Sequence, residues 1–165
     1  HVDGRGLELS QEGVNACVSQ GLSVVQGDAD VDLANYPGGA FDYVILSQTL
    51  QATRNPRQVL LELLRIGRHT IISFPNFGYW RVRWHLLAHG RMPMTATLDR
   101  PWYLTPNIHL CTISDFEHLC HEVGIAIDKR LTVNADGGGE AAPNSGWFAN
   151  LFGEQAVYLL SMERA

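Results

Sequence analysis

The sequence is short of positive charge and of long apolar runs. It has 12 Lys and Arg against 17 Asp and Glu, a formal net charge of −5 at pH 7, so it lacks the positive field with which proteins bind nucleic acid backbones. No window of about 18 apolar residues is long enough for a membrane-spanning helix, and no basic-then-apolar leader opens the chain. We therefore expect no nucleic acid partner, no membrane contact and a cytoplasmic location.

Cysteine is also scarce, with Cys17, Cys111 and Cys120 forming no paired framework. Such a pattern is typical of reduced thiols and predicts no disulfide. Two of these cysteines lie near His109, His118 and His121, and this mixture contains the right ligand types for zinc. Helical spacing, however, places Cys120 on an apolar stripe that the last two histidines do not share. We predict no metal site.

Two common motifs are missing. Ser47 has no Gly-x-Ser-x-Gly elbow around it, which argues against a serine hydrolase. The Gly-rich "DGGGE" at 136–140 is not followed by the Lys-Ser/Thr of a phosphate cradle. We interpret the surrounding "NADGGGEAAPNSG" as a flexible loop.

What is present fits one globular domain. The 165 residues are 45% hydrophobic and 18% charged, enough to build a sizeable core. Short apolar runs predict strands at 5–9, 22–25, 43–46, 69–74, 125–133 and 155–162. Between them lie helices that we expect to begin at Ser10, at Asn55 with Pro56 in the first turn, and at a capping box of Ser114 and Glu117. This alternation predicts an α/β sheet with parallel strands, the last two strands forming a hairpin pair.

Polar side chains follow three successive strands, where ligands of open α/β sheets bind. Glu8 ends the first in "GLELS", Asp28 follows the second in "QGDAD", and Ser47 and Gln48 end the third in "LSQTLQA". A carboxylate at the first position could accept both hydroxyls of a ribose, and a group at the second could reach an adenine edge. The alternative is that these residues only cap the following helix or turn.

An aromatic and arginine-rich stretch, "SFPNFGYWRVRW", follows the fourth strand. The connection over residues 78–112 is about three times the usual length, which favours a lid or binding surface. Trp80, Trp84 and Leu87 would share one helix face, so the tryptophans could equally be core. The arginines of this connection could meet an acidic partner or an anionic substrate; they are Arg81, Arg83, Arg91 and Arg100. We interpret the segment as a lid that also docks a protein.

Long motifs resemble the methionine biosynthesis protein MetW family: "SQTLQAT", "SFPNFG", "TPNIHLCTI" and, near the C-terminus, "NLFGEQAVYLL". The resemblance covers essentially the whole chain, residues 1–165. It implies a Rossmann-like class I methyltransferase sheet, mostly parallel with a C-terminal antiparallel strand, and S-adenosylmethionine or S-adenosylhomocysteine as cofactor. It also implies a role in methionine biosynthesis beside a homoserine O-acyltransferase.

The family's cofactor-binding positions fall on Glu8 and Leu9, on Asp28 and Ala29, and on Ser47 and Gln48. The chain begins at His1, without the first strand and the "DLGCGDG"-like loop of that fold. A parallel sheet without its central strand exposes two hydrogen-bonding edges and a large apolar face. We therefore expect such residues to exist upstream of His1.

Two functions from different classes follow. In the first, the protein binds and activates the acyltransferase through Arg81, Arg83 and Trp84, and the cofactor signals methionine status. In the second, it transfers a methyl group from S-adenosylmethionine to a small acceptor. The candidate acceptor-side residues are Asn76, Tyr103, Asn107 and His109, although both asparagines stand beside prolines and could be turn formers. The sequence assigns no catalytic residue and leaves open whether the protein is a homodimer.

Overall fold

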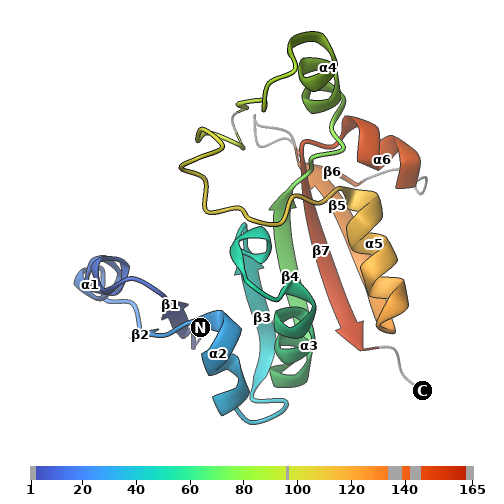
Figure 1. The fold of residues 1–165 in the computed structure, drawn as a ribbon. Helices are drawn as coiled ribbons and strands as arrows, with labels where there is room; N and C mark the ends of the chain where they lie inside the picture. Colours follow the sequence, from blue (N-terminus) through green and yellow to red (C-terminus); the bar gives the residue numbers. More distant parts are fainter. Residues whose placement is uncertain (1–2, 96, 134–138, 142–145, 163–165) are drawn as a thin grey trace.

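A computed structural model describes residues 3–95, 97–133, 139–141 and 146–162 (Figure 1). Its strands form two sheets, a small one of order β1-β2 and a larger one of order β3-β4-β7-β5-β6. The bounds are β1 (Gly6–Glu8), β2 (Val24–Gln26), β3 (Phe41–Ser47), β4 (Gly67–Pro75), β5 (Ile125–Val133), β6 (Gly139–Ala141) and β7 (Gln155–Met162). All six predicted strands are present. The short β6 lies within the stretch that we interpreted as a flexible loop; residues 134–138 and 142–145 of that stretch lie outside the described residues.

The strand directions match the expected mostly parallel sheet with an antiparallel C-terminal strand. β1 pairs in parallel with β2, and β3 pairs in parallel with β4. β7 is antiparallel to both β4 and β5, so β3, β4 and β5 point the same way. The predicted hairpin-like pairing of the last two long strands, β5 and β7, is therefore confirmed. Among the described residues, β3 pairs with β4 alone, and no strand joins it to the small sheet.

The helices connect these strands and have recognisable start signals. Their bounds are α1 (Gln11–Ser19), α2 (Ala29–Asp32), α3 (Pro56–Ile66), α4 (Trp80–His89), α5 (Ile113–Glu122) and α6 (Gly146–Phe152). As predicted, Ser10 caps α1 by accepting the Gly13 amide, and Asn55 caps α3 by accepting the Gln58 amide. None of the described helices has the length and apolar character to span a membrane.

The predicted start of α5 was wrong by two residues. Thr112 is the N-cap: its hydroxyl accepts the Asp115 amide, and the Asp115 carboxylate accepts the Thr112 amide. The expected partner Glu117 is engaged elsewhere. Its carboxylate accepts the Tyr158 hydroxyl at 2.9 Å and pairs with Arg130, which joins the helix to the sheet.

The core lies between the larger sheet and helices α3 and α5. Side chains alternate along a strand, so Ile72 and Phe74 of β4 and Tyr158 and Leu160 of β7 all face the helices and are fully buried. Phe116 of α5 packs between two of these rings, with its centroid 4.8 Å from Phe74 and 4.7 Å from Tyr158. This packing fixes β4, whose end forms one side of the cavity described below.

The connection after β4 contains α4 and then an extended segment (Figure 1). Val82 of α4 is buried in a small separate cluster with Tyr79 and Leu98. Trp80, Trp84 and Leu87 are 43%, 61% and 80% exposed. The interpretation of the tryptophans as core residues is therefore not supported.

Candidate functional site

The carboxyl end of β1 presents a carboxylate with one oxygen available. Ser10 donates from its amide at 2.9 Å and from its hydroxyl at 2.8 Å, in both cases to Oε1 of Glu8. These hydrogen bonds hold the pKa of Glu8 below its usual range. No hydrogen bond from the described residues reaches Oε2. Glu8 can therefore orient the helix start and still accept hydroxyl groups of a ligand, while the next residue, Leu9, is exposed.

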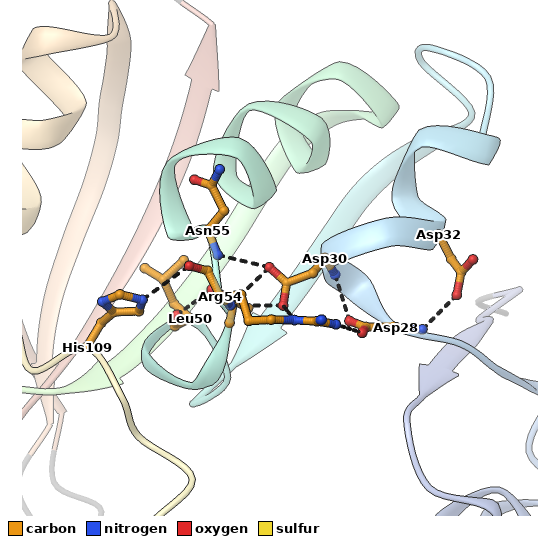
Figure 2. Close-up of polar contacts among 8 residues, drawn as sticks. Asp28, Asp30, Asp32, Leu50, Arg54, Asn55 and His109 are labelled. Carbon is orange, nitrogen blue, oxygen red and sulfur yellow. Dashed lines mark hydrogen bonds and ion pairs between the residues drawn. The ribbon is translucent and has the colours of Figure 1, made fainter.

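Asp28 follows the adjacent strand, and Figure 2 shows its contacts. It is the N-cap of α2, with Oδ1 accepting the amide of Asp30 at 2.9 Å. Its Oδ2 pairs with the guanidinium of Arg54, and its own amide donates to Asp32 at 2.7 Å. Ala29 is the first residue of α2. The predicted capping role is therefore present, and it does not remove the carboxylate from the strand end.

Arg54 and Asp30 extend this cluster, and sequence reasoning missed both. The two oxygens of Asp30 accept the Arg54 amide at 3.0 and 2.9 Å, and one of them also accepts the Asn55 amide at 3.0 Å. Burial of this carboxylate opposes ionisation, but the amide hydrogen bonds and the nearby Arg54 charge together hold the pKa of Asp30 below its usual range. Asp30 and its partners are 24 or more residues apart in the sequence, so no local sequence pattern could have predicted these contacts.

The end of β3 is held against β4. The Ser47 hydroxyl lies 3.3 Å from the Ser73 hydroxyl, and the Gln48 amide donates to the Ser73 carbonyl oxygen at 2.9 Å. Gln48 has φ of +52°. A non-glycine residue in this conformation costs about 1 kcal/mol or more, and such residues are enriched at functional sites. Here it turns the chain at the wall of a cavity.

That cavity, of about 470 Å³, lies between the ends of β3 and β4 and the segment that follows α4. Phe77, Leu98 and Trp102 contribute apolar surface to its wall. Its polar lining residues include Gln48, Asp99, Arg100 and Asn107. The volume of this cavity and its mixture of apolar and polar lining residues are typical of a small-molecule binding site.

The four candidate acceptor-side residues have different surroundings. Asn107 lines the cavity, whereas Tyr103 is exposed and outside its lining. His109 is exposed, with Nε2 3.3 Å from the Arg54 carbonyl oxygen. The Asn76 amide group donates to Asn150 and Gly153 carbonyls and accepts the amides of Gly78 and Ile113. These four bonds use the full capacity of a buried asparagine side chain, so the structure gives Asn76 a packing role.

The three candidate docking residues lie on α4. Arg81 stacks over the ring of Trp80 at 5.5 Å, and Arg83 donates from Nε to the Gly78 carbonyl oxygen at 2.6 Å. Trp84 lines an apolar groove of about 490 Å³ whose other wall is Leu151 of α6. Neither helix contains an acidic residue. α6 also exposes three aromatic rings, those of Trp147, Phe148 and Phe152.

Metal-ligating side chains are not clustered in the described part of the chain. No group of three or more His, Cys, Asp or Glu side chains there lies close enough to hold an ion. The site is therefore built from carboxylates, an arginine and a mixed cavity.

Comparison with known proteins identifies a family and a relative that match this chain. The family model described as "Methionine biosynthesis protein MetW" matches residues 1–160. A bifunctional methionine biosynthesis protein MetXA/MetW from Rhodopirellula baltica is 38% identical over 159 residues, which is 96% of this chain. The matched region is only 25% of the length of that relative.

Solved structures show the same fold. A SAM-dependent methyltransferase from Thermotoga maritima, described as a possible histamine N-methyltransferase, matches with a TM-score of 0.68 at 13% identity, over 99% of this chain and 84% of that one. A SAM-dependent methyltransferase from Methanosarcina mazei matches with a TM-score of 0.62 at 11% identity, over 97% and 82% of the two chains. The expected class I methyltransferase fold is confirmed.

Proposed function

This chain belongs to the methionine biosynthesis protein MetW family, and on that premise we propose that it acts with a homoserine O-acyltransferase and activates it. The observation that carries the proposal is the relative whose name joins MetXA and MetW in one chain. Covalent linkage keeps two modules at high effective concentration. The same pair on separate chains needs a docking surface instead. With this role the protein would work in the cytoplasm.

The groove between α4 and α6 supports such a surface. Trp84 and Leu87 are exposed beside Arg81 and Arg83, in a part of the chain without acidic residues. Exposed tryptophan and arginine are the residues that dominate binding energy at protein interfaces. The arginines favour a partner with an acidic rim, because opposite charges also guide association.

We further propose that S-adenosylmethionine or S-adenosylhomocysteine binds at the carboxyl ends of β1, β2 and β3. The hydrogen-bond acceptors fit the nucleoside: Oε2 of Glu8 can accept ribose hydroxyls and Asp28 can accept the amino group of adenine, with the backbone of Ala29 beside it. Leu9 offers apolar contact, and Ser47 and Gln48 lie where the amino-acid part would extend. In the accessory role, this ligand reports methionine status.

Methyl transfer to a small molecule is the alternative, and the cavity beside Gln48 favours it. Bound S-adenosylmethionine would supply an electrophilic methyl group. Residues of the chain would align the acceptor and exclude water, which can provide most of the rate enhancement when the acceptor is already nucleophilic. Asn107, Asp99 and Arg100 are the polar groups of the cavity wall available for this alignment.

Two measurements separate these functions. The first is co-purification with the acyltransferase, followed by acyl-transfer assays with and without this protein. The second is calorimetry with S-adenosylhomocysteine. Binding and stimulation of the acyltransferase support the accessory role. If the protein neither binds nor stimulates the acyltransferase but methylates a small molecule, methyl transfer replaces the accessory role. If S-adenosylhomocysteine produces no heat, the proposed cofactor binding is rejected.

A further inference from the structure

We propose that Arg54 is the positioning residue of the nucleoside subsite, holding the carboxylate of Asp28 where it accepts the 6-amino group of a bound adenine. This inference rests on the proposed binding of S-adenosylmethionine or S-adenosylhomocysteine. The sequence analysis did not mark Arg54. It lies between β3 and α3, whereas Asp28 lies between β2 and α2.

The main chain of Arg54 is fixed by hydrogen bonds to Asp30, independently of its side chain. Asp30 accepts the Arg54 amide with both oxygens and the Asn55 amide with one of them (Figure 2). Only 13% of the Asp30 side chain is exposed. Oδ2 of Asp30 also lies 3.6 Å from Nε of Arg54, and Asp28 pairs with the guanidinium at Nη2, so the two carboxylates after β2 together hold the main chain and the side chain of one residue. The direction of the guanidinium is thereby set.

The connection between β3 and α3, which contains Arg54, is also held by the segment that forms the cavity wall. The carbonyl oxygen of Gln51 accepts the amides of Ile108 and His109 at 2.9 and 3.0 Å. The His109 ring reaches the carbonyl oxygen of Arg54 at 3.3 Å. A loop held from both sides is pre-organised, so little conformational entropy is lost when it orients Asp28 for a ligand.

Stability does not explain the Arg54–Asp28 pair. The side chain of Arg54 is 68% exposed and that of Asp28 is 28% exposed, and pairs this exposed contribute little to folding. Orientation is the larger effect. Oδ1 of Asp28 is held by the Asp30 amide and Oδ2 by the guanidinium, and each carboxylate oxygen can accept one more hydrogen bond.

An ionised carboxylate fixed in this way selects its base. The 6-amino group of adenine is a donor and satisfies the carboxylate. The 6-oxo group of hypoxanthine is an acceptor and would face it unpaired, which is costly for a desolvated charge. Removing the guanidinium leaves the Asp28 carboxylate held by the Asp30 amide alone, so Oδ2 is no longer fixed. We therefore expect loss of Arg54 to weaken binding and also to reduce discrimination between the two bases.

Calorimetry of the protein with S-adenosylhomocysteine and with S-inosylhomocysteine tests this role. For Arg54→Ala we expect about tenfold weaker binding of the adenine ligand and about a fivefold smaller preference over the inosine ligand, the loss of one hydrogen-bonding arrangement at a charged group. Arg54→Lys should keep part of the preference, because an ammonium pairs with Asp28 but lacks the planar fork. Arg57→Ala, an exposed arginine in the first turn of α3, is the matched control and should bind as wild type.

The outcomes are distinct. If wild type binds the adenine ligand and Arg54→Ala keeps both affinity and preference, the inference is overturned. Tighter binding by Arg54→Ala also overturns it, because the arginine would then compete for Asp28. If wild type binds neither ligand, the nucleoside site itself fails and the inference fails with it. Thermal melts check folding, and Arg54→Gln joins Arg54→Lys should the alanine variant not fold.

Discussion

At the scale of single residues, Asp30 joins two segments that are distant in sequence, and its charge should be visible in stability. Asp30→Asn keeps the size but removes the charge, so we expect the free energy of unfolding to fall by about 1–2 kcal/mol at pH 7. The pKa of Asp30 is lowered in the folded protein. Its contribution is therefore present above the unfolded pKa and is lost as pH falls through the folded value.

Urea denaturation of wild type and Asp30→Asn between pH 7 and pH 2 measures this. The difference between the two proteins should shrink in acid. Asp42→Asn is the control, because Asp42 is exposed and its pair with Arg68 spans 3.5 Å at the surface; it should change little at any pH. A difference for Asp30→Asn that does not depend on pH would mean that the amide hydrogen bonds do not need the charge.

Asn76 should prove to be a structural residue. Asn76→Ala leaves two buried amides and two carbonyl oxygens without their partners, and such groups cost 1–3 kcal/mol each when water cannot replace the bond. We expect the free energy of unfolding to fall by about 3 kcal/mol. Asn107→Ala, in the cavity wall, is the matched control and should alter stability by under about 0.5 kcal/mol. Equal stability of both variants would return Asn76 to the list of ligand-binding candidates.

The sequence could mark residues whose role depends on their place at a strand end, and it could not mark their long-range partners. Glu8 and Asp28 were placed correctly at strand ends because strand ends are readable from apolar runs. Arg54 was missed because its partner Asp28 is 26 residues away. Asn76 was assigned to the acceptor side because a sequence does not show that Asn150 and Gly153 carbonyls meet its amide group.

At the scale of secondary-structure elements, the start of α5 provides a direct comparison of two candidate caps. Thr112 and Asp115 exchange the hydrogen bonds of a capping box, so Thr112→Ala should lower the free energy of unfolding by about 1 kcal/mol. Ser114→Ala, the cap that spacing predicted, should lower it by much less. Chemical denaturation of both variants decides between them, and a larger loss for Ser114→Ala would contradict the assigned cap.

Elements with one buried face were predicted well, and elements at the surface were not. β7 has the predicted bounds, because its side chains alternate between buried and partly exposed along the strand. α4 forms where the spacing of its tryptophans predicts, but helical spacing says only that they share a face. It does not say whether anything covers that face, and here they are exposed. α6 has seven residues, too few to establish a period.

At the scale of the whole molecule, the two proposed binding regions are separate. α4 and α6 lie together at one end of the larger sheet, away from the small β1-β2 sheet (Figure 1). The residues proposed to bind the nucleoside follow β1, β2 and β3, so a partner seated on α4 and α6 would leave them accessible. The overall charge of −5 also makes the basic, acid-free α4 a local exception. A protein with this layout can bind an acidic partner and a nucleoside at once.

The last prediction tests that separation. Trp84→Ala should weaken co-purification with the acyltransferase by about tenfold or more, because a tryptophan anchor at an interface centre contributes at least that much, and Leu87→Ala should weaken it by a smaller factor, because leucine seldom dominates binding energy. Both side chains are mostly exposed, so melting temperatures should stay near wild type, and the affinity for S-adenosylhomocysteine should not change. Leu22→Ala, an exposed leucine just before β2, is the matched control and should leave co-purification unchanged.

Since Arg83 is held by the Gly78 carbonyl oxygen, Arg81→Ala is the cleaner test of charge, and it should slow association most at low salt. Wild-type co-purification by all three α4 variants would show that the acyltransferase binds elsewhere, whereas parallel losses of partner and nucleoside binding would show that the two regions are not independent.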